Sequence, residues 1–193
     1  RIGLPGQAAA KKTKEIRKEL SIDEVELDSY GNKHKNLIKL HRLTEALGLE
    51  GVSVPKPSGI KSEQMQKFLH NHAPEVLKEW ETLQDLYQCY QGRVPFFEDP
   101  EVKSHLSSIE AGITHAFSQK NAFESLELSD AFGEWLEKMR GEGNYLMVRS
   151  TGAEDSKKSA NAGGNTSISY VVPEKEQLCA ALGEVIKSYF SSV

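Results

Sequence analysis

This sequence has few cysteines and no long apolar run, and both features limit the classes of protein to which it can belong. Of the 193 residues only two are cysteines, Cys89 and Cys179, which lie far apart and without the spacing of metal ligands. We therefore expect two reduced thiols in a cytoplasmic protein. No apolar run approaches the roughly 20 residues that a membrane-spanning helix needs, so we expect no membrane partner.

An excess of positive charge is also missing. The chain has 24 Lys and Arg residues against 28 Asp and Glu, which gives a formal net charge of −4. Domains that bind nucleic acid are usually basic, so we expect no nucleic-acid partner. What the chain does have is the composition of a soluble globular protein, with 38% hydrophobic and 27% charged residues. Its length is enough for one substantial core.

The two ends of the sequence suggest a piece of a longer protein. The chain begins at Arg1 without the pattern of a signal peptide, and it stops at Val193 inside a helical pattern that has no C-terminal cap. We interpret residues 1–20 as a lead or linker with a solvated, lysine-rich face, and residues 21–193 as the folded domain.

Helical periodicity is strong in the first half of the folded domain. A short edge strand is predicted over 21–28, and a helix over 33–47, where leucines recur at helical spacing. Gly48 or Gly51 then stands where a helix C-terminus favours glycine. The proline-containing segment VSVPKPSGI predicts an extended connection after this helix.

A helical middle is predicted over 60–141. Ser62 is expected to cap one helix and Pro74 to open the next. Two further amphipathic helices are predicted over 100–117 and 129–140. Four aromatic side chains at helical spacing are expected in the core: Trp80, Tyr87, Phe132 and Trp135.

Two apolar runs near the end of the sequence predict strands. These are NYLMVRS, which ends near Arg149, and SISYVV, and a last helix is expected to open at Pro173. Together the elements predict an α/β or α+β fold with a small mixed sheet and a helical insertion, incomplete at its C-terminus.

The first stretch with chemical potential is Gly31-Asn32-Lys33, at the start of the predicted helix over 33–47. A glycine before a helix lets the backbone approach a ligand, and the exposed amides there favour an anion. Lys33 adds a charge that can reach a phosphate. Ordinary turn chemistry is the alternative interpretation.

The second stretch is VRSTGAEDSKKSANAGGNTSISYV, residues 148–171. Arg149 ends a buried strand, where its guanidinium can bind phosphate oxygens at two points. Gly163 and Gly164 permit close backbone approach, and Thr166 and Ser167 add hydroxyl groups. The alternative is a surface hairpin whose arginine pairs with Glu154 or Asp155.

In order and spacing, the two stretches resemble the nucleotide-binding domain of the pyruvate phosphate dikinase and phosphoenolpyruvate synthase family. That family opens with G-G-K-G-x-N-L followed by V-P-x-G-F, and this chain has GNKHKNL and VSVPKPSGI. The family then has R-S-S, an E-D pair and A-G with a serine or threonine four residues later, and this chain has RSTGAED and AGGNTS. The ending AGGNTSISYV is similar to A-G-L-Y-D-S-I-S-N-V of the glucan, water dikinases. About a fifth of the chain carries these motifs.

The resemblance implies an ATP-grasp fold, of which this chain would be the N-terminal portion. It implies catalytic roles for Lys33 and Arg149, with ATP bound by these two residues and by Ser150, Gly163, Gly164, Thr166 and Ser167. Mg²⁺ is implied as a cofactor, with its carboxylate ligands outside this sequence and no metal ligand within it.

The activity that the resemblance implies is phosphoryl transfer in two stages. ATP would phosphorylate a histidine on a downstream domain, and the phosphoryl group would pass to pyruvate or a similar acceptor, with release of AMP and phosphate. The ATP-binding portion alone is not expected to be active.

Some positions depart from the family pattern. Asn32, His34 and Lys35 stand where small residues are usual, and Ala160-Asn161 replaces a serine and a phenylalanine. These departures motivate an alternative, a diverged non-catalytic or regulatory module that binds a nucleotide or a partner. The histidines form no carboxylate-backed metal set, and we expect them to be surface residues.

Overall fold

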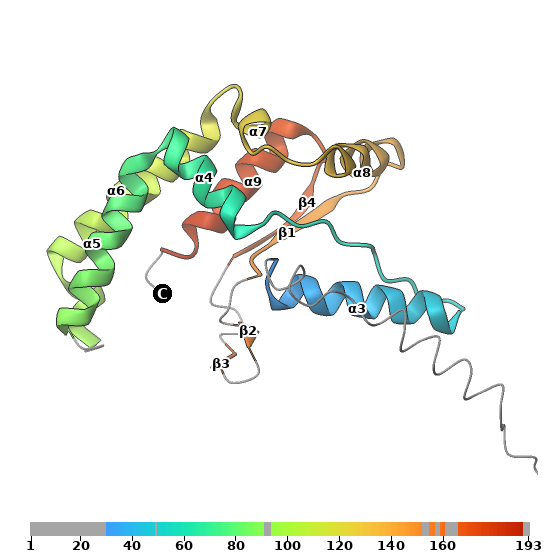
Figure 1. Cartoon of the computed structure of the whole chain (residues 1–193), viewed down its shortest axis with the longest axis horizontal. Helices are drawn as coiled ribbons and strands as arrows, with labels where there is room; N and C mark the ends of the chain where they lie inside the picture. The colour runs from blue at the N-terminus through green and yellow to red at the C-terminus, as the bar shows by residue number, and fades with distance from the viewer. Residues whose placement is uncertain are drawn as a thin grey trace, which may run out of the picture. The chain divides into compact units, whose positions relative to one another are not determined.

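The computed structural model describes residues 30–48, 50–90, 94–151, 155–156, 159–160 and 166–190. The chain divides into two compact units, and Figure 1 labels most of their helices and strands. The first unit is Arg1–Gly59 with Thr151–Ala160, and the second is Ile60–Ser150 with Asn161–Val193. The predicted lead over 1–20 and the predicted strand over 21–28 lie outside the described residues.

The main element of the first unit is helix α3 (Asn32–Leu47), which confirms the helix predicted over 33–47. It begins after Gly31, which has φ +82°, and it ends at Gly48, which has φ +59°. The Gly48 amide donates a hydrogen bond to the carbonyl of Glu45. Left-handed backbone of this kind favours glycine at both positions, so glycines bound the helix at each end.

The segment after α3 has no regular secondary structure up to Lys61, as its prolines predict. Nδ1 of His41 lies 2.6 Å from the carbonyl oxygen of Val54, so the ring donates a hydrogen bond that ties the segment back to the helix. Gly59 lies against Tyr30 and His34, and a Cβ at Gly59 would come within 3.0 Å of both rings. The close approach therefore depends on glycine.

Two short strands complete the described part of the first unit. They are β2 (Asp155–Ser156) and β3 (Ser159–Ala160), which pair antiparallel with Asp155 opposite Ala160. The sequence interpretation placed Asp155 in a solvated turn or beside Arg149, and it did not predict this hairpin. Strands of two residues have too short a period-2 pattern to be recognised.

The second unit contains the predicted helical middle. Its helices are α4 (Ser62–His72), α5 (Pro74–Tyr90), α6 (Pro100–Ser118), α7 (Ala122–Ser125) and α8 (Asp130–Gly141), with the 3₁₀ helix η1 (Val94–Glu98) before α6. Pro74 opens α5 as predicted, whereas Lys61 rather than Ser62 is the N-cap of α4. Asp99 and Ser129 cap α6 and α8 by accepting hydrogen bonds from backbone amides.

Helices α4, α5 and α6 enclose the larger core, and α5 and α6 lie side by side in Figure 1. Its largest fully buried side chains are Phe68, Val76, Val102, Ile109, Ile113 and Leu126. Burying each of them contributes on the order of 2 kcal/mol. Two of the aromatic residues predicted for the core, Trp80 and Tyr87, are instead 40% and 46% exposed. The Trp80 ring forms a T-shaped pair with Phe190, and the Tyr87 ring forms one with Phe96.

The smaller core lies under a two-stranded antiparallel ladder. The ladder consists of β1 (Leu146–Arg149) and β4 (Ser167–Val171), and helix α9 (Lys175–Lys187) packs against both strands. The two strands confirm the predicted hairpin arms, although α9 begins at Lys175 rather than at Pro173. Phe132 is buried here as predicted, and Trp135 is half-buried.

The register of the β1–β4 ladder changes along its length. Leu146 lies opposite Val171 and Val148 opposite Ile168, with a β-bulge between these pairs. Within the bulge Tyr170 has φ +59°, which is uncommon for a residue with a large side chain. The described chain is thus mainly helical with small antiparallel ladders, and the predicted mixture of helices and strands is confirmed at that level.

Candidate anion-binding site

Arg149 and Ser167, both predicted site residues, lie opposite each other at one end of the β1–β4 ladder. Side chains in β1 alternate between buried and exposed, and the burial of Leu146 and Val148 leaves Arg149 exposed. Directly opposite residues in a ladder point to the same face of the sheet. The guanidinium and the Ser167 hydroxyl therefore project on the same side, as an oxyanion site requires.

Thr166, the residue before β4, is held in place by a buried serine. Its backbone amide donates a 3.0 Å hydrogen bond to Oγ of Ser188, and that hydroxyl donates a 2.6 Å hydrogen bond to the carbonyl of Val185. Ser188 is only 7% exposed. This pair of hydrogen bonds joins the start of β4 to the end of α9. It leaves the Thr166 side chain, rather than its amide, available to a ligand.

Sequence reasoning did not identify Ser188. A serine near the end of a helix is common, and only the tertiary structure shows which amide it contacts. Ser150 was predicted to bind the ligand, and it is 4% exposed, so little of its surface is accessible to one. Gly163 and Gly164 lie outside the described residues.

In the first unit, the two motif stretches meet at Gly31. Thr151 follows Arg149 and Ser150 in the chain, and its hydroxyl donates a hydrogen bond to the carbonyl of Tyr30. A Cβ at Gly31 would lie 1.5 Å from the carbonyl oxygen of Thr151. Residues 121 positions apart thus pack together at the start of α3, and only glycine permits this distance.

Lys33 lies in the first turn of α3 and is half-buried. This turn contains no acidic side chain, and no side chain caps its amides. The positive end of the helix dipole and the lysine therefore act in the same direction on an anion. Lys33 belongs to the first unit and Arg149 to the second, so their convergence on one ligand stays a prediction.

His34 differs from the expectation of a surface histidine, because it is only 9% exposed. Its ring stacks on Tyr30 with 4.9 Å between centroids, and it lies against Gly59. Burial lowers the pKa of His34 below its usual value, because desolvation disfavours the charged ring. A packed imidazole, for which burial favours the neutral form, thus occupies a position where the pyruvate phosphate dikinase and phosphoenolpyruvate synthase family has glycine.

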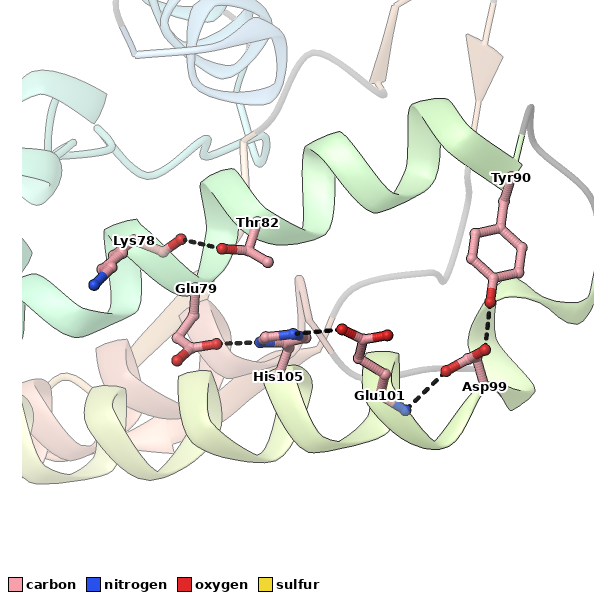
Figure 2. Close-up of polar contacts among 7 residues, drawn as sticks. All are labelled: Lys78, Glu79, Thr82, Tyr90, Asp99, Glu101 and His105. Carbon is pink, nitrogen blue, oxygen red and sulfur yellow. Dashed lines mark hydrogen bonds and ion pairs between the residues drawn. The ribbon is translucent and has the colours of Figure 1, made fainter.

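Polar side chains outside the predicted site residues link α5 to α6 (Figure 2). Nδ1 of His105 contacts the Glu79 carboxylate, and Nε2 of the same ring lies 4.0 Å from Glu101. At the other end, the Tyr90 hydroxyl donates to Asp99, the residue that caps α6. This hydrogen bond raises the pKa of Tyr90 and lowers the pKa of Asp99. The cluster joins two helices, and we assign it a structural role.

The cysteines are free thiols, as predicted, with Cys89 exposed and Cys179 buried. Burial raises the pKa of Cys179 to about 11, so this thiol is neutral at pH 7 and a poor nucleophile. Among the described residues, no group of three His, Cys, Asp or Glu side chains is arranged to hold a metal ion. Within the same residues, no helix is both long enough and apolar enough to cross a membrane.

Comparison of the chain with models of protein families, with curated proteins and with solved structures gives no match.

Proposed function

We propose that this chain is the ATP-binding portion of a cytoplasmic dikinase-type phosphotransferase, similar to pyruvate phosphate dikinase and phosphoenolpyruvate synthase. The observation that carries the proposal is the contact between Gly31 and Thr151. It supports the proposal because it joins, within one unit, the ends of two motif stretches that the family uses together. The alternative interpretation, a surface hairpin after Arg149, does not predict a contact with the glycine that precedes Lys33 by two residues.

In this proposal the side chains of Arg149 and Lys33 both bind the triphosphate of ATP. Arg149 binds phosphate oxygens at two points, and Lys33 neutralises charge at the start of α3. Exposed Thr166 and Ser167 supply hydroxyl donors beside Arg149. The resemblance assigns Gly163 and Gly164 to the phosphate-binding loop. Phosphoryl transfer depends largely on positioning and charge neutralisation, which these groups provide.

The proposed reaction passes a phosphoryl group from ATP to a histidine on a downstream domain and then to pyruvate or a similar acceptor. AMP is released, and one water molecule takes the remaining phosphoryl group of ATP, which leaves as phosphate. The resemblance implies that the carboxylate ligands of Mg²⁺ lie outside this sequence, and we derive no step through the metal. The partners are therefore ATP and the downstream domains, and the portion alone is not expected to turn over.

The second candidate is a diverged regulatory module that keeps the fold and binds nucleotide weakly or not at all. The packing of His34 favours it. A buried ring between Tyr30 and Gly59 replaces the small residue of the family pattern at the predicted pocket. A ligand that needs this space would have to displace a stacked imidazole.

Calorimetric titration of the full-length protein with ATP and magnesium tests both candidates. Arg149→Ala and Lys33→Ala are each expected to weaken binding by at least about 1.5 kcal/mol, the scale of a hydrogen bond to a charged group. Arg140→Ala and Lys103→Ala remove exposed cations from α8 and α6 and serve as matched controls with unchanged affinity. No ATP binding by the wild type refutes the first candidate and supports the second.

A further inference from the structure

A shallow groove lies in the second unit between strand β4 and helix α9, with a volume of about 500 Å³. One side is formed by four consecutive strand residues, 168–171. The other side is formed by one face of the helix: Glu176, Gln177, Ala180, Ala181 and Glu184. None of these residues belongs to the candidate anion-binding site.

The strand side of the groove has an unpaired edge. Strand β4 pairs with β1 on one side, and no described strand pairs with its other side. An exposed strand edge presents amide and carbonyl groups to any extended chain that can reach it. A groove between a strand edge and a helix is a geometry in which an extended peptide can add as a further strand.

The helix side of the groove has a small-residue centre between two acids. Glu176, Ala180 and Glu184 are four residues apart, so they share one helix face, and all three are exposed. Ala180 leaves room for an incoming side chain. Glu184 already has Lys187 as an ion-pair partner at 2.5 Å, whereas Glu176 has no ion-pair partner among the described residues. The rim is therefore negative.

One residue of the strand side, Tyr170, brings an aromatic side chain to the groove. Tyr170 is 81% exposed, and its ring meets that of Tyr145 edge to face, with 6.2 Å between centroids. Aromatic faces beside carboxylates attract ammonium and guanidinium groups by cation–π and Coulomb interactions. The walls of the groove thus favour basic side chains on an extended backbone.

We propose that this groove binds an extended, lysine- or arginine-bearing segment of a partner protein, which pairs with β4 and places its cations toward Glu176 and Glu184. The segment's backbone adds to the strand edge, and its smaller side chains lie over Ala180. The proposal is independent of nucleotide binding, since it uses neither Lys33 nor Arg149.

Fluorescence anisotropy of the full-length protein with a labelled peptide of four Lys-Val repeats tests this directly. The peptide is expected to bind, and a Glu-Val peptide of equal length is not. A Lys-Val peptide N-methylated at every residue has no amide donor on either edge and cannot form the ladder, so it is expected to bind at least about tenfold more weakly. Equal binding of the methylated and unmethylated peptides overturns the proposed strand pairing.

Two variants place the binding in the groove. Ala180→Arg fills the exposed centre and adds like charge, and Glu176→Gln combined with Glu184→Gln removes the negative rim. Each is expected to reduce affinity at least about tenfold, with a weaker dependence on salt for the glutamine variant. Glu81→Gln removes an exposed acid from α5, outside the groove, and is the matched control.

All the changed side chains are exposed, so both variants are expected to fold. Circular dichroism checks this. Affinity unchanged by Ala180→Arg overturns the proposal. A concentration-dependent dimer in sedimentation that Ala180→Arg abolishes, with no peptide binding by the wild type, assigns the groove to a second copy of the chain and also overturns it.

Discussion

Replacing Gly31 by alanine tests the contact on which the proposed function rests. Two costs add in this variant. An alanine at φ +82° and ψ 167° would occupy a backbone region that is essentially restricted to glycine, which costs about 1–3 kcal/mol. Its Cβ would also lie 1.5 Å from the Thr151 carbonyl oxygen, where ordinary contacts need about 3.5 Å. Thr151 must therefore move by about 2 Å, which breaks its hydrogen bond to Tyr30 at a cost of about 1 kcal/mol.

Gly48 provides a matched control at the other end of the same helix. It has φ +59°, but a Cβ there would meet nothing within 4 Å. Gly48→Ala should pay the backbone cost alone, about 1 kcal/mol, while Gly31→Ala should cost at least about 1 kcal/mol more. The difference between the two variants contains the contact with Thr151 and a larger backbone cost at Gly31, because Gly31 has ψ 167° whereas Gly48 has ψ 44°.

Two measurements give the result. Urea unfolding gives the stability difference, and hydrogen exchange reports the protection of amides near Thr151 and at the start of α3. In Gly31→Ala both segments should exchange faster, whereas in Gly48→Ala only the end of α3 should. If the two variants lose equal stability and the start of α3 keeps its protection in Gly31→Ala, the packing of the two motif stretches is wrong, and the proposed function loses its main support.

Three further predictions concern the second unit. Ser188→Ala removes the acceptor of the Thr166 amide, so it should cost about 1–3 kcal/mol in urea unfolding and speed hydrogen exchange at that amide. Gly112→Ala places a methyl group 2.5 Å from Cγ2 of Val76, and this overpacking should lower stability by about 1–3 kcal/mol. Tyr90→Phe removes the hydrogen bond that lowers the pKa of Asp99 in the folded state. A carboxyl group whose pKa is lowered in the folded state stabilises the fold at pH values above the pKa of the unfolded state, which is 3.8 for Asp99. At pH 6 the variant should therefore have a lower melting temperature than wild type. The difference in melting temperature should decrease as the pH falls below about 3.8.

Each of these has a control within the same unit. Ser118→Ala removes an exposed hydroxyl that bonds only the carbonyl of His115, and it should be near neutral. Gly133→Ala lies in α8 with open space around it and should stabilise by up to about 1 kcal/mol, opposite in sign to Gly112→Ala. A melting difference between wild type and Tyr90→Phe that persists unchanged at about pH 3 contradicts the assigned role of the Asp99 carboxylate.

The sequence predicted most of the helices because their signals are local. Pro74 opens α5, glycine ends α3 at Gly48, and both lie within a few residues of the boundary that they set. The arms of the β1–β4 hairpin were also predictable, because NYLMVRS and SISYVV are apolar runs, although β1 is buried on one face only rather than throughout. The errors at Ser62 and Pro173 are shifts of one or two residues at helix starts.

The errors about burial have a different cause. Trp80 and Tyr87 have helical spacing, yet they are partly exposed, and His34 has a polar side chain, yet it is buried. Spacing along a helix tells which residues share a face, but not which other element covers that face. Gly59 comes 25 positions after His34, and no local pattern predicts that it will leave space for the imidazole.

The sequence by itself therefore determined the helix ends, the hairpin arms and the positions of Arg149 and Lys33 at element boundaries, since these follow from backbone preferences of neighbouring residues. Only the tertiary structure decided that Thr151 packs on Gly31, that Ser188 holds Thr166, and that β4 and α9 form a groove. Each of these contacts joins residues distant in the chain, and its geometry depends on the packing of whole elements rather than on local conformational preference.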